Sequence, residues 1–330
     1  MSYLDNKIGI AGMGFYFPKN IRHTKFITEE IGLPDKVYEQ IGISQIYVPD
    51  NEDHPRFMAK KSAIKALQDA KVAPEQVDLI VVPVFKNEFM GWQMSIWLKE
   101  NLGAKNALTM ECRGGCAAFF EAIEFAADQI NSSSNIETVL VSSSERLYGY
   151  GWPSFLSTGS QSIVLKKNCQ NLTYLGFETN NYIAHHDIAY IPNGGIESPF
   201  NKNTPWENGA FDNVVSNTNA YYEHIKPHFF TKFIETFDRL LKKTGYSKND
   251  IDFMVTITQQ RNFDTRILKA IGLDCLPNAN EFKSKLGHFG GADTYILLNE
   301  AIKNKKVKKG DLILEFVIGG IGWYASLIRY

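Results

Sequence analysis

The alternation of apolar and polar positions divides the chain into helices and buried strands. Residues 55–69 carry apolar side chains at helical spacing, and a polar turn then leads into the apolar run 77–84. A continuous apolar run of this length is typical of a strand buried on both faces, as in a parallel or mixed sheet that helices cover. The pattern therefore predicts an α/β fold.

The same succession returns in the second half of the chain. Residues 234–243 are helical in pattern, residues 245–250 form a polar turn, and residues 251–258 are again a buried strand. Each strand begins with an aliphatic residue and an aspartate, Val77-Asp78 in the first and Ile251-Asp252 in the second. We interpret the repetition as the duplication of one α/β unit.

The rest of the pattern fits two such units. Further elements are predicted as strands at 136–142, 162–166, 172–178, 311–317 and the C-terminus, and as a helix at 292–302. We place the boundary at residues 168–171, which gives an N-terminal half of residues 1–170 and a C-terminal half of residues 171–330.

Two stretches interrupt this regular pattern. Residues 7–16 are predicted to be a short strand that enters a glycine-rich turn, and no helix follows to make their Gly-x-x-Gly-x-Gly spacing a dinucleotide fingerprint. Residues 181–215 show no periodicity and are predicted to be a long loop that forms part of a substrate entrance. His185-His186-Asp187 lies in this loop, but adjacent residues do not share one face of a helix or strand, which disfavours a metal site.

Composition narrows the classes of partner. The chain has 35 Lys and Arg residues against 36 Asp and Glu, a formal net charge of -1, so global charge does not favour nucleic acid or an anionic membrane. Residues 1–7 lack the basic and apolar regions of a signal peptide, and no apolar run is long enough to cross a bilayer. We expect a cytoplasmic protein that binds neither nucleic acid nor membrane.

The cysteines indicate a free thiol. The four cysteines are too few and too irregularly spaced for a disulfide framework: Cys112, Cys116, Cys169 and Cys275. Cys112 and Cys116 also lack the second close pair that a zinc site would need, so no metal is expected.

Cys116 has the setting of a nucleophile. Gly114-Gly115 precedes it, and a glycine pair allows a tight elbow that lifts the next side chain out of the fold. Residues 117–130 then carry apolar residues at helical spacing, so Cys116 would lie at a helix N-terminus, where unpaired N–H groups and the helix dipole favour a thiolate. The alternative is a small, buried apolar residue beneath a glycine-rich turn.

The element order, the duplicated half and the elbow cysteine together resemble the thiolase fold, and specifically the β-ketoacyl-ACP synthase III family, over essentially the whole chain. Cys116-Ala117-Ala118-Phe119 stands where that family has its nucleophilic cysteine followed by x-Gly-Phe. Residues 309–314 and Gly319-Gly320-Ile321-Gly322-Trp323 resemble its C-terminal strand and glycine-rich turn. The resemblance implies two similar βαβα halves in a five-layer α-β-α-β-α arrangement, a homodimer, and an active site between the halves.

Two departures from the family change the expected chemistry. The family has its catalytic histidine in a Pro-His-Gln-Ala-Asn phrase, whereas this chain reads Thr258-Gln259-Gln260-Arg261-Asn262, and Gln259 cannot act as a base. The family asparagine follows a glycine before the next helix, and here Gly287-His288 puts a histidine in that place. Asp293 follows five residues later and is expected to orient His288, as the third group of a triad does.

The set Cys116, His288 and Asp293 is similar to that of the acyltransferase and starter-unit members of the family from antibiotic pathways. The alternatives are that His288 fills a turn beside glycines, and that Asp293 caps the helix that begins at Thr294. In the catalytic interpretation Cys116 attacks a thioester, and the oxyanion lies, by resemblance, against the backbone N–H groups of Cys116 and Gly319. His288 then removes a proton from a hydroxyl, an amine or an acidic carbon.

The expected donor is an acyl-ACP or acyl-CoA substrate, with no other cofactor. Family members that use coenzyme A hold it with a Trp and an Arg in a Trp-Ile-x-x-Arg-x-Gly-Ile phrase, and the matching residues 36–43 lack both, which favours a carrier protein or an unusual acyl-CoA pose. The candidate substrate contacts are Gln259, Phe85, Phe89 and Trp92. By resemblance the aromatic residues lie at the dimer contact and pocket wall, and plain core packing is the alternative.

We therefore predict an acyltransferase of the synthase III type that acts on a small-molecule acceptor in secondary-metabolite biosynthesis. One alternative is a synthase that decarboxylates a malonyl thioester and forms a carbon–carbon bond. In the family a histidine and an asparagine stabilise that enolate, and Gln259 and His288 replace them here. The other alternative is an inactive partner subunit of a heterodimeric synthase, because Gln259 stands where the family has its histidine.

Overall fold

Strands from both halves of the chain join in one mixed sheet in this computed structural model. They are β1 (Gly9–Tyr16), β4 (Leu79–Pro83), β5 (Leu108–Cys112), β6 (Thr138–Glu145), β7 (Gly159–Lys166), β8 (Thr173–Asn181), β11 (Phe253–Thr256), β12 (Leu312–Gly319) and β13 (Gly322–Arg329). Their order is β11-β12-β13-β8-β1-β7-β6-β4-β5. Two small sheets pair β2 (Asn20–His23) with β3 (Gln45–Val48), and β9 (Ala189–Tyr190) with β10 (Val215–Ser216).

The helices are α2 (Thr24–Glu30), α3 (Asp35–Ile41), α4 (Pro55–Ala70), α5 (Met94–Leu102), α6 (Ala118–Ser132), α7 (Thr218–Ala220), α8 (Phe229–Thr244), α9 (Phe263–Ile271), α10 (Asn280–Lys283) and α11 (Asp293–Lys303). Within the described residues, none of them is both long enough and apolar enough to cross a membrane.

The structure describes residues 7–30, 32, 34–147, 155–181, 189–190, 193, 196–199, 201, 215–319 and 322–330. Most of the predicted loop at 181–215, including His185-His186-Asp187, therefore lies outside the described residues. The strands and helices predicted from apolar periodicity are confirmed, with ends that differ by a few residues.

The two halves repeat the same strand pairing. β4 pairs parallel with β6 as β11 does with β12, and β6 pairs antiparallel with β7 as β12 does with β13. The aspartates of the repeated phrase also act alike, because Asp78 accepts the N–H of Thr138 at 2.9 Å and Asp252 accepts that of Leu312 at 2.8 Å. The duplication read from the sequence is therefore present in the geometry.

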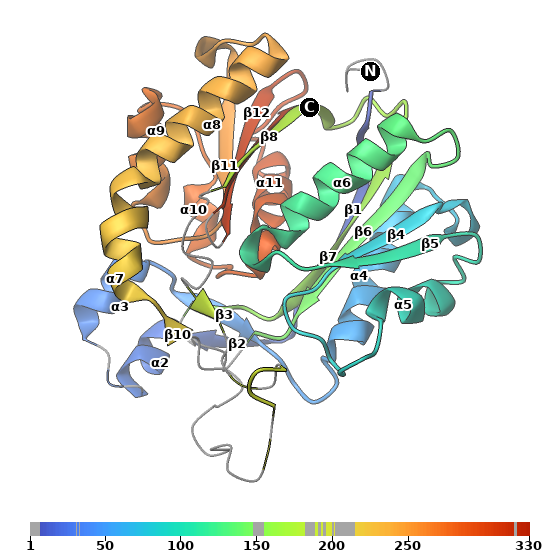
Figure 1. The fold of residues 1–330 in the computed structure, drawn as a ribbon, viewed down its shortest axis with the longest axis horizontal. Helices are drawn as coiled ribbons and strands as arrows, with labels where there is room; N and C mark the ends of the chain where they lie inside the picture. The colour runs from blue at the N-terminus through green and yellow to red at the C-terminus, as the bar shows by residue number, and fades with distance from the viewer. Residues whose placement is uncertain are drawn as a thin grey trace.

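Helices cover both faces of each half, and two of them meet in the middle. Along β4, Ile80 and Val82 pack with α4, whereas Leu79 and Val81 pack with α6. Along β12, Glu315 bonds to Thr294 of α11, and Phe316 packs on Phe233 of α8. The rings of Phe119 in α6 and Tyr295 in α11 are 5.4 Å apart. These two helices form the middle layer, with the N-terminal strands on one side, the C-terminal strands on the other and the remaining helices outside, which gives the predicted five layers (Figure 1).

The glycines of β1 do not form the turn predicted from the sequence. The strand continues through them to Tyr16. A Cβ atom on Gly12 or Gly14 would lie within 2.5 Å of the backbone of α4, so both glycines are needed because the helix crosses the strand at close range. The prediction of a turn was wrong because these glycines allow close packing of a helix on the strand.

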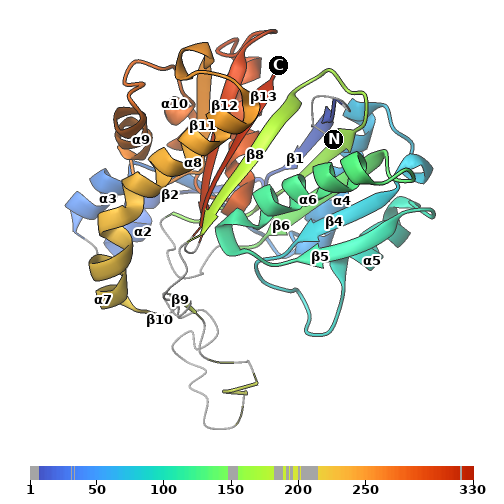
Figure 2. The same ribbon diagram turned by 45° about the horizontal axis from the view of Figure 1, so that its top comes forward.

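One N-terminal segment lies beside the C-terminal half. The blue ribbon of α2 and α3 lies next to the orange elements in both views (Figures 1 and 2). Ser44 Oγ donates to the carbonyl oxygen of Ser284 at 2.9 Å, and Gln45 Nε2 donates to that of Lys285 at 3.1 Å. The division into residues 1–170 and 171–330 remains a prediction.

We expect Gly14→Ala to destabilise the protein by about 1–3 kcal/mol, because the added methyl group would force α4 away from β1. Urea unfolding of the two proteins measures the change. Exposed Lys105→Ala is the control and should stay within about 0.5 kcal/mol of the original chain. A Gly14→Ala protein of unchanged stability would contradict the close approach of helix and strand.

Candidate active site

Cys116 lies on a tight turn between β5 and α6. The turn, residues Gly115–Ala117, is a single 3₁₀ turn, and Gly115 has φ +58°, a conformation that L side chains rarely adopt. α6 begins two residues after Cys116, at Ala118. The half-buried Cys116 side chain is therefore held at the N-terminal end of α6, as the sequence predicts.

A histidine and an aspartate from the C-terminal half meet this cysteine. His288 Nε2 is 3.4 Å from Cys116 Sγ, and His288 Nδ1 is 2.6 Å from Asp293 Oδ2. The histidine is 2% exposed and the aspartate 1% exposed. The structure thus brings together the three residues singled out as catalytic candidates, with the histidine and the aspartate buried and the cysteine half-buried.

The carboxylate of Asp293 is turned toward the histidine and does not cap a helix. Asp293 is the first residue of α11, and Ala292 is its N-cap residue. Asp293 Oδ2 accepts the N–H of Thr258 at 2.8 Å, and Oδ1 accepts the N–H of Phe289 at 2.6 Å. The alternative prediction of a helix cap was therefore wrong.

The backbone and ring of His288 are fixed from a third side by the segment 155–157. The N–H of His288 donates to the carbonyl oxygen of Phe155 at 3.0 Å, and the N–H of Ser157 donates to that of His288 at 2.8 Å. The rings of Phe155 and His288 are 5.0 Å apart. His288 is therefore oriented by its neighbours on the backbone, on its ring face and at both ring nitrogens.

The charges around His288 favour its protonated form in the resting site. Burial by itself lowers the pKa of His288, but the Asp293 carboxylate and the Cys116 thiolate outweigh this effect and raise that pKa to about 10. At neutral pH the imidazole is therefore protonated beside the Cys116 sulfur.

Cys112, four residues earlier, has the opposite environment. Burial, followed by the charges of Glu121 and Glu111, raises the pKa of the Cys112 thiol to about 11. Cys112 is therefore a neutral thiol at physiological pH, and only Cys116 of this close pair has a histidine next to its sulfur.

The end of β12 packs against the cysteine turn. Gly319 is the last residue of β12, and a Cβ atom on it would lie 2.5 Å from the backbone nitrogen of Ala117. Gly319 therefore stands beside the elbow, where the predicted oxyanion site would be. Gly320 and Ile321, the next residues of the predicted glycine turn, lie outside the described residues.

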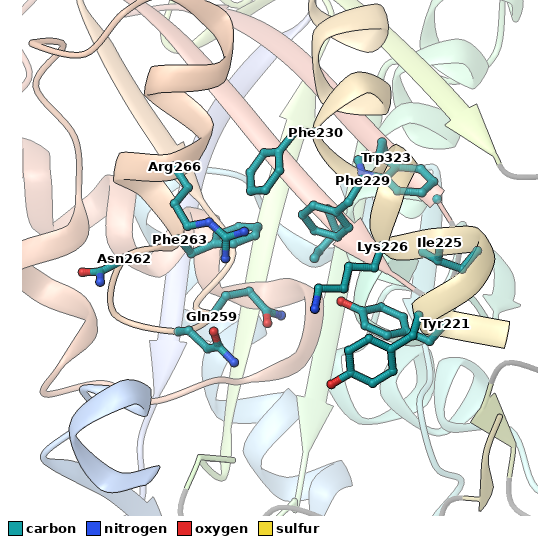
Figure 3. A pocket seen from close by; sticks show the side chains of 14 residues that line it. Tyr221, Ile225, Lys226, Phe229, Phe230, Gln259, Asn262, Phe263, Arg266 and Trp323 are labelled. Atoms are coloured by element: carbon teal, nitrogen blue, oxygen red, sulfur yellow. The ribbon is translucent and has the colours of Figure 1, made fainter. Parts of the chain in front are cut away.

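A cavity of about 520 Å³ opens between α8 and α9 (Figure 3). Its aromatic lining includes Tyr221, Phe229 and Trp323. Gln259 also lines it, and the residue before it, Thr258, donates its N–H to Asp293, so this part of the lining is next to the triad. Lys226 and Arg266 both point into it, and in the described part of the chain neither is paired with a carboxylate. The cavity is thus suited to an anionic group on a partly apolar ligand.

A second cavity of about 410 Å³ shares Gln259 with the first. Its lining includes Arg261, Lys283 and part of the segment 36–43 that matches the family's coenzyme A phrase, namely Tyr38, Glu39, Ile41, Gly42 and Ile43. Gln259 is half-buried and lines both cavities, and its role as a substrate contact stays a prediction.

The predicted aromatic contacts are divided between two regions. The N–H of Phe85 donates to Glu145 Oε1 at 3.2 Å, on the triad side of the sheet. Phe89 packs edge-on against Trp92 with ring centres 5.5 Å apart, and Trp92 packs on the core beneath α4 and α5. Within one chain, the fold does not bring Trp92 to the cysteine.

Glu145 is a buried acid near the triad that the sequence did not reveal. It ends β6, and burial raises its pKa to about 8, although the Phe85 N–H and the charge of His288 lower it in part. A strand that ends in Ser-Ser-Ser-Glu carries no pattern by which an acid buried behind a histidine could be recognised. Among the described residues, no cluster of three or more His, Cys, Asp or Glu side chains could hold a metal ion.

We expect iodoacetamide to modify Cys116 faster than Cys112 at pH 7, because only Cys116 pairs with an imidazolium. Asp293→Asn removes a charge that raises the pKa of His288, so the thiolate should form only at higher pH. The acid-side midpoint of the alkylation rate against pH should rise by about one unit. Peptide mass spectrometry measures both rates.

Exposed Asp238→Asn on α8 is the control, and its alkylation profile should match that of the original protein. Equal rates at the two cysteines, or an unchanged profile in Asp293→Asn, would contradict the ion pair.

Comparison with known proteins gives matches along the chain. Residues 241–330 match the family described as 3-oxoacyl-[acyl-carrier-protein (ACP)] synthase III C terminal. A curated relative from Prochlorococcus marinus (strain MIT 9215), named beta-ketoacyl-[acyl-carrier-protein] synthase III, is 25% identical over 98% of both chains.

Solved structures share the fold over nearly the full length. A 3-oxoacyl-[acyl-carrier-protein] synthase III from Aquifex aeolicus VF5 superposes with a TM-score of 0.77 and 22% identity, over 98% of this chain and all of that one. ChlB3, described as an acyltransferase, superposes with a TM-score of 0.82 and 20% identity, over 98% of this chain and 97% of that one. With the duplicated five-layer fold, these matches show that the chain has the thiolase fold and is similar over nearly its whole length to β-ketoacyl-ACP synthase III proteins.

Proposed function

We propose that the protein is an acyltransferase that carries an acyl group on Cys116 and passes it to an acceptor with the help of His288 and Asp293. The observation that carries the proposal is the continuous chain from Cys116 Sγ through the imidazole to the buried carboxylate, at 3.4 and 2.6 Å. A cysteine oriented in this way toward a histidine, which is in turn held by a carboxylate, is the arrangement of an activated nucleophile.

In the first half-reaction the Cys116 thiolate attacks the carbonyl carbon of a thioester. The new carbon–sulfur bond forms, and the oxyanion is stabilised by the backbone N–H groups of Cys116 and Gly319. The donor thiolate then leaves and takes the proton from the His288 imidazolium. The products are an acyl-enzyme, a free thiol and a neutral imidazole.

The second half-reaction restores the protonated imidazole with a proton taken from the acceptor. Acylation removes the thiolate charge, which is one of the causes of the raised pKa of His288, so that pKa falls and the neutral imidazole, the form that can accept a proton, is favoured. It removes the proton of the acceptor as the acceptor attacks the acyl carbon. Cys116 leaves as a thiolate, and the resting ion pair is restored.

The first cavity is the proposed route of the donor. The phosphopantetheine arm of a carrier protein or of coenzyme A has a phosphate and a slender amide chain. Lys226 and Arg266 supply two cations over aromatic walls, and neither has a carboxylate partner among the described residues. The segment 36–43 lacks the Trp and Arg of the family's coenzyme A phrase, which favours a carrier protein as donor.

Two other functions make different demands on the same site. A decarboxylating synthase would use His288 and the amide of Gln259 to stabilise an enolate, and it would release carbon dioxide from a malonyl thioester. An inactive partner subunit would not need the complete Cys116-His288-Asp293 chain, so the geometry favours an enzyme. The Cys-His-Asp set, which resembles that of antibiotic-pathway members, supports a role in secondary metabolism.

We also propose that the protein is a homodimer joined along β5. This strand pairs with β4 on one side, and in the described residues no strand covers the other side. Leu108 on it is 64% exposed, and nearby Met90 and Ile96 are 82% and 52% exposed. An open edge with exposed apolar residues is suited to pairing with a second copy.

Intact mass spectrometry after incubation with acetyl to octanoyl and malonyl thioesters, on coenzyme A and on a carrier protein, tests the acyl-enzyme. We expect a mass gain equal to one acyl group, which Cys116→Ala abolishes. His288→Ala should still load at raised pH but should discharge to acceptors about 10²–10⁴-fold more slowly, because the general base is lost.

The matched control is Cys169→Ala, which removes another thiol and should load normally. Failure of every donor to load Cys116 would contradict the proposal and favour the partner-subunit alternative. Release of carbon dioxide with carbon–carbon bond formation would favour the synthase alternative.

For the dimer, we expect Leu108→Lys to convert the protein largely to a monomer, because a charge would be buried at the strand edge. Light scattering after size-exclusion chromatography measures the mass. Ile64→Lys replaces an exposed apolar residue on α4 and should leave the dimer intact. A monomer in the unaltered protein would refute this part of the proposal.

A further inference from the structure

A buried ion pair lies directly behind the triad. Lys283 Nζ is 2.8 Å from Oδ1 and 2.7 Å from Oδ2 of Asp264. It also donates to Thr256 Oγ1 at 2.6 Å and to the carbonyl oxygen of Ile257 at 3.1 Å. Lys283 is 5% exposed and Asp264 2% exposed. The three donors of the ammonium group are thus used on a carboxylate, a hydroxyl and a backbone carbonyl.

The pair joins three separate elements, since Lys283 ends α10, Asp264 belongs to α9 and Thr256 ends β11. Burying two charges costs desolvation energy that their attraction often fails to exceed, and apolar replacements of similar volume are frequently as stable. Stability alone therefore does not account for this pair. What the pair does is fix the end of β11, through the bonds of Lys283 to Thr256 and Ile257.

The side chain of Lys283 reaches the triad through one peptide unit. It holds Thr256 and Ile257, and the next residue, Thr258, donates its N–H to Asp293 Oδ2 at 2.8 Å. A shift at the end of β11 would therefore move a hydrogen-bond donor of the catalytic carboxylate.

The backbone of Lys283 reaches the triad from the other side. Its carbonyl oxygen accepts the N–H of Leu286 at 3.1 Å and that of Gly287 at 3.2 Å. Gly287, which has φ +75°, immediately precedes His288. Lys283 is thus connected both to the donor that holds Asp293 and to the turn that presents the imidazole.

We propose that Lys283 and Asp264 are positioning residues that hold the Thr258 N–H and the His288 imidazole at hydrogen-bonding distance from the Asp293 carboxylate. The expected change in the rate of acyl discharge rests on the proposed function. The expected change in the thiolate–imidazolium pair does not depend on acyl transfer. Neither residue lies within contact of Cys116 in the described structure, so they act through the backbone of β11 and of the 283–287 turn.

The test is the double variant Lys283→Met/Asp264→Leu, which replaces both charges with apolar side chains and leaves no unpaired charge in the core. We expect a melting temperature near that of the original protein. The acid-side midpoint of Cys116 alkylation should move to higher pH, in the direction set by Asp293→Asn. Discharge of acyl-Cys116 should slow about 10–100-fold, because a displacement of about 1 Å in a catalytic group has an effect of this size.

The matched control removes a different ion pair, Arg239 and Glu178, which are 3.0 Å apart on α8 and β8. Arg239→Met/Glu178→Gln should leave the alkylation profile and the discharge rate unchanged. If the double variant does not fold, Asp264→Asn, which keeps the shape of the side chain, is the second test variant. It should also move the alkylation midpoint to higher pH.

The outcomes separate this inference from the proposed function. Alkylation needs no thioester, so an unshifted profile in a folded double variant or in Asp264→Asn overturns the positioning role even if no donor ever loads Cys116. Conversely, a shifted profile together with no loading by any donor would retain the positioning role and reject the acyl transfer. An unchanged discharge rate in a variant with a shifted profile would limit the pair to the resting state and overturn its kinetic role.

Discussion

The site depends on a single buried carboxylate that accepts three hydrogen bonds. Asp293 receives one from the imidazole, one from the end of β11 and one from the backbone next to the histidine, and it is 1% exposed. A carboxylate removed from water in this way is stable only with such donors around it. Because these donors come from different segments, the same interaction that stabilises the charge also fixes the position of His288 relative to the cysteine turn.

Much of this could be predicted because its signals are local. A glycine pair next to a helical pattern identified the elbow of Cys116, since the backbone conformation at Gly115 is one that few other residues adopt. The pair of His288 and Asp293 was found because its members are five residues apart and stand at the start of a helix. The buried strands and the duplicated fold followed from long apolar runs, which depend on burial alone.

The rest depends on contacts that have no local signature. Lys283 and Asp264 are 19 residues apart and are of types that are usually exposed, so nothing in the sequence marks them as a buried pair. Gly14 reads as a turn residue, although the constraint comes from a helix about 50 residues away that presses on the strand. Trp92 was placed by resemblance at the dimer contact and pocket wall, with core packing as the alternative; in one chain it packs against the core, and its role in a dimer stays a prediction.

The two halves differ at the outer edges of the sheet, and this difference limits where a further strand could pair with it. In the C-terminal half no strand stands beside β11 as β5 stands beside β4 within the described residues. Instead Met254 gives its N–H to Pro277 and accepts that of Ala279, which closes the edge with a single bridge. Within the described residues, the sheet therefore has one edge closed by this bridge and one edge, β5, without a neighbouring strand. In the proposed dimer, a second copy that paired with β5 would leave no open edge of this sheet for a third copy.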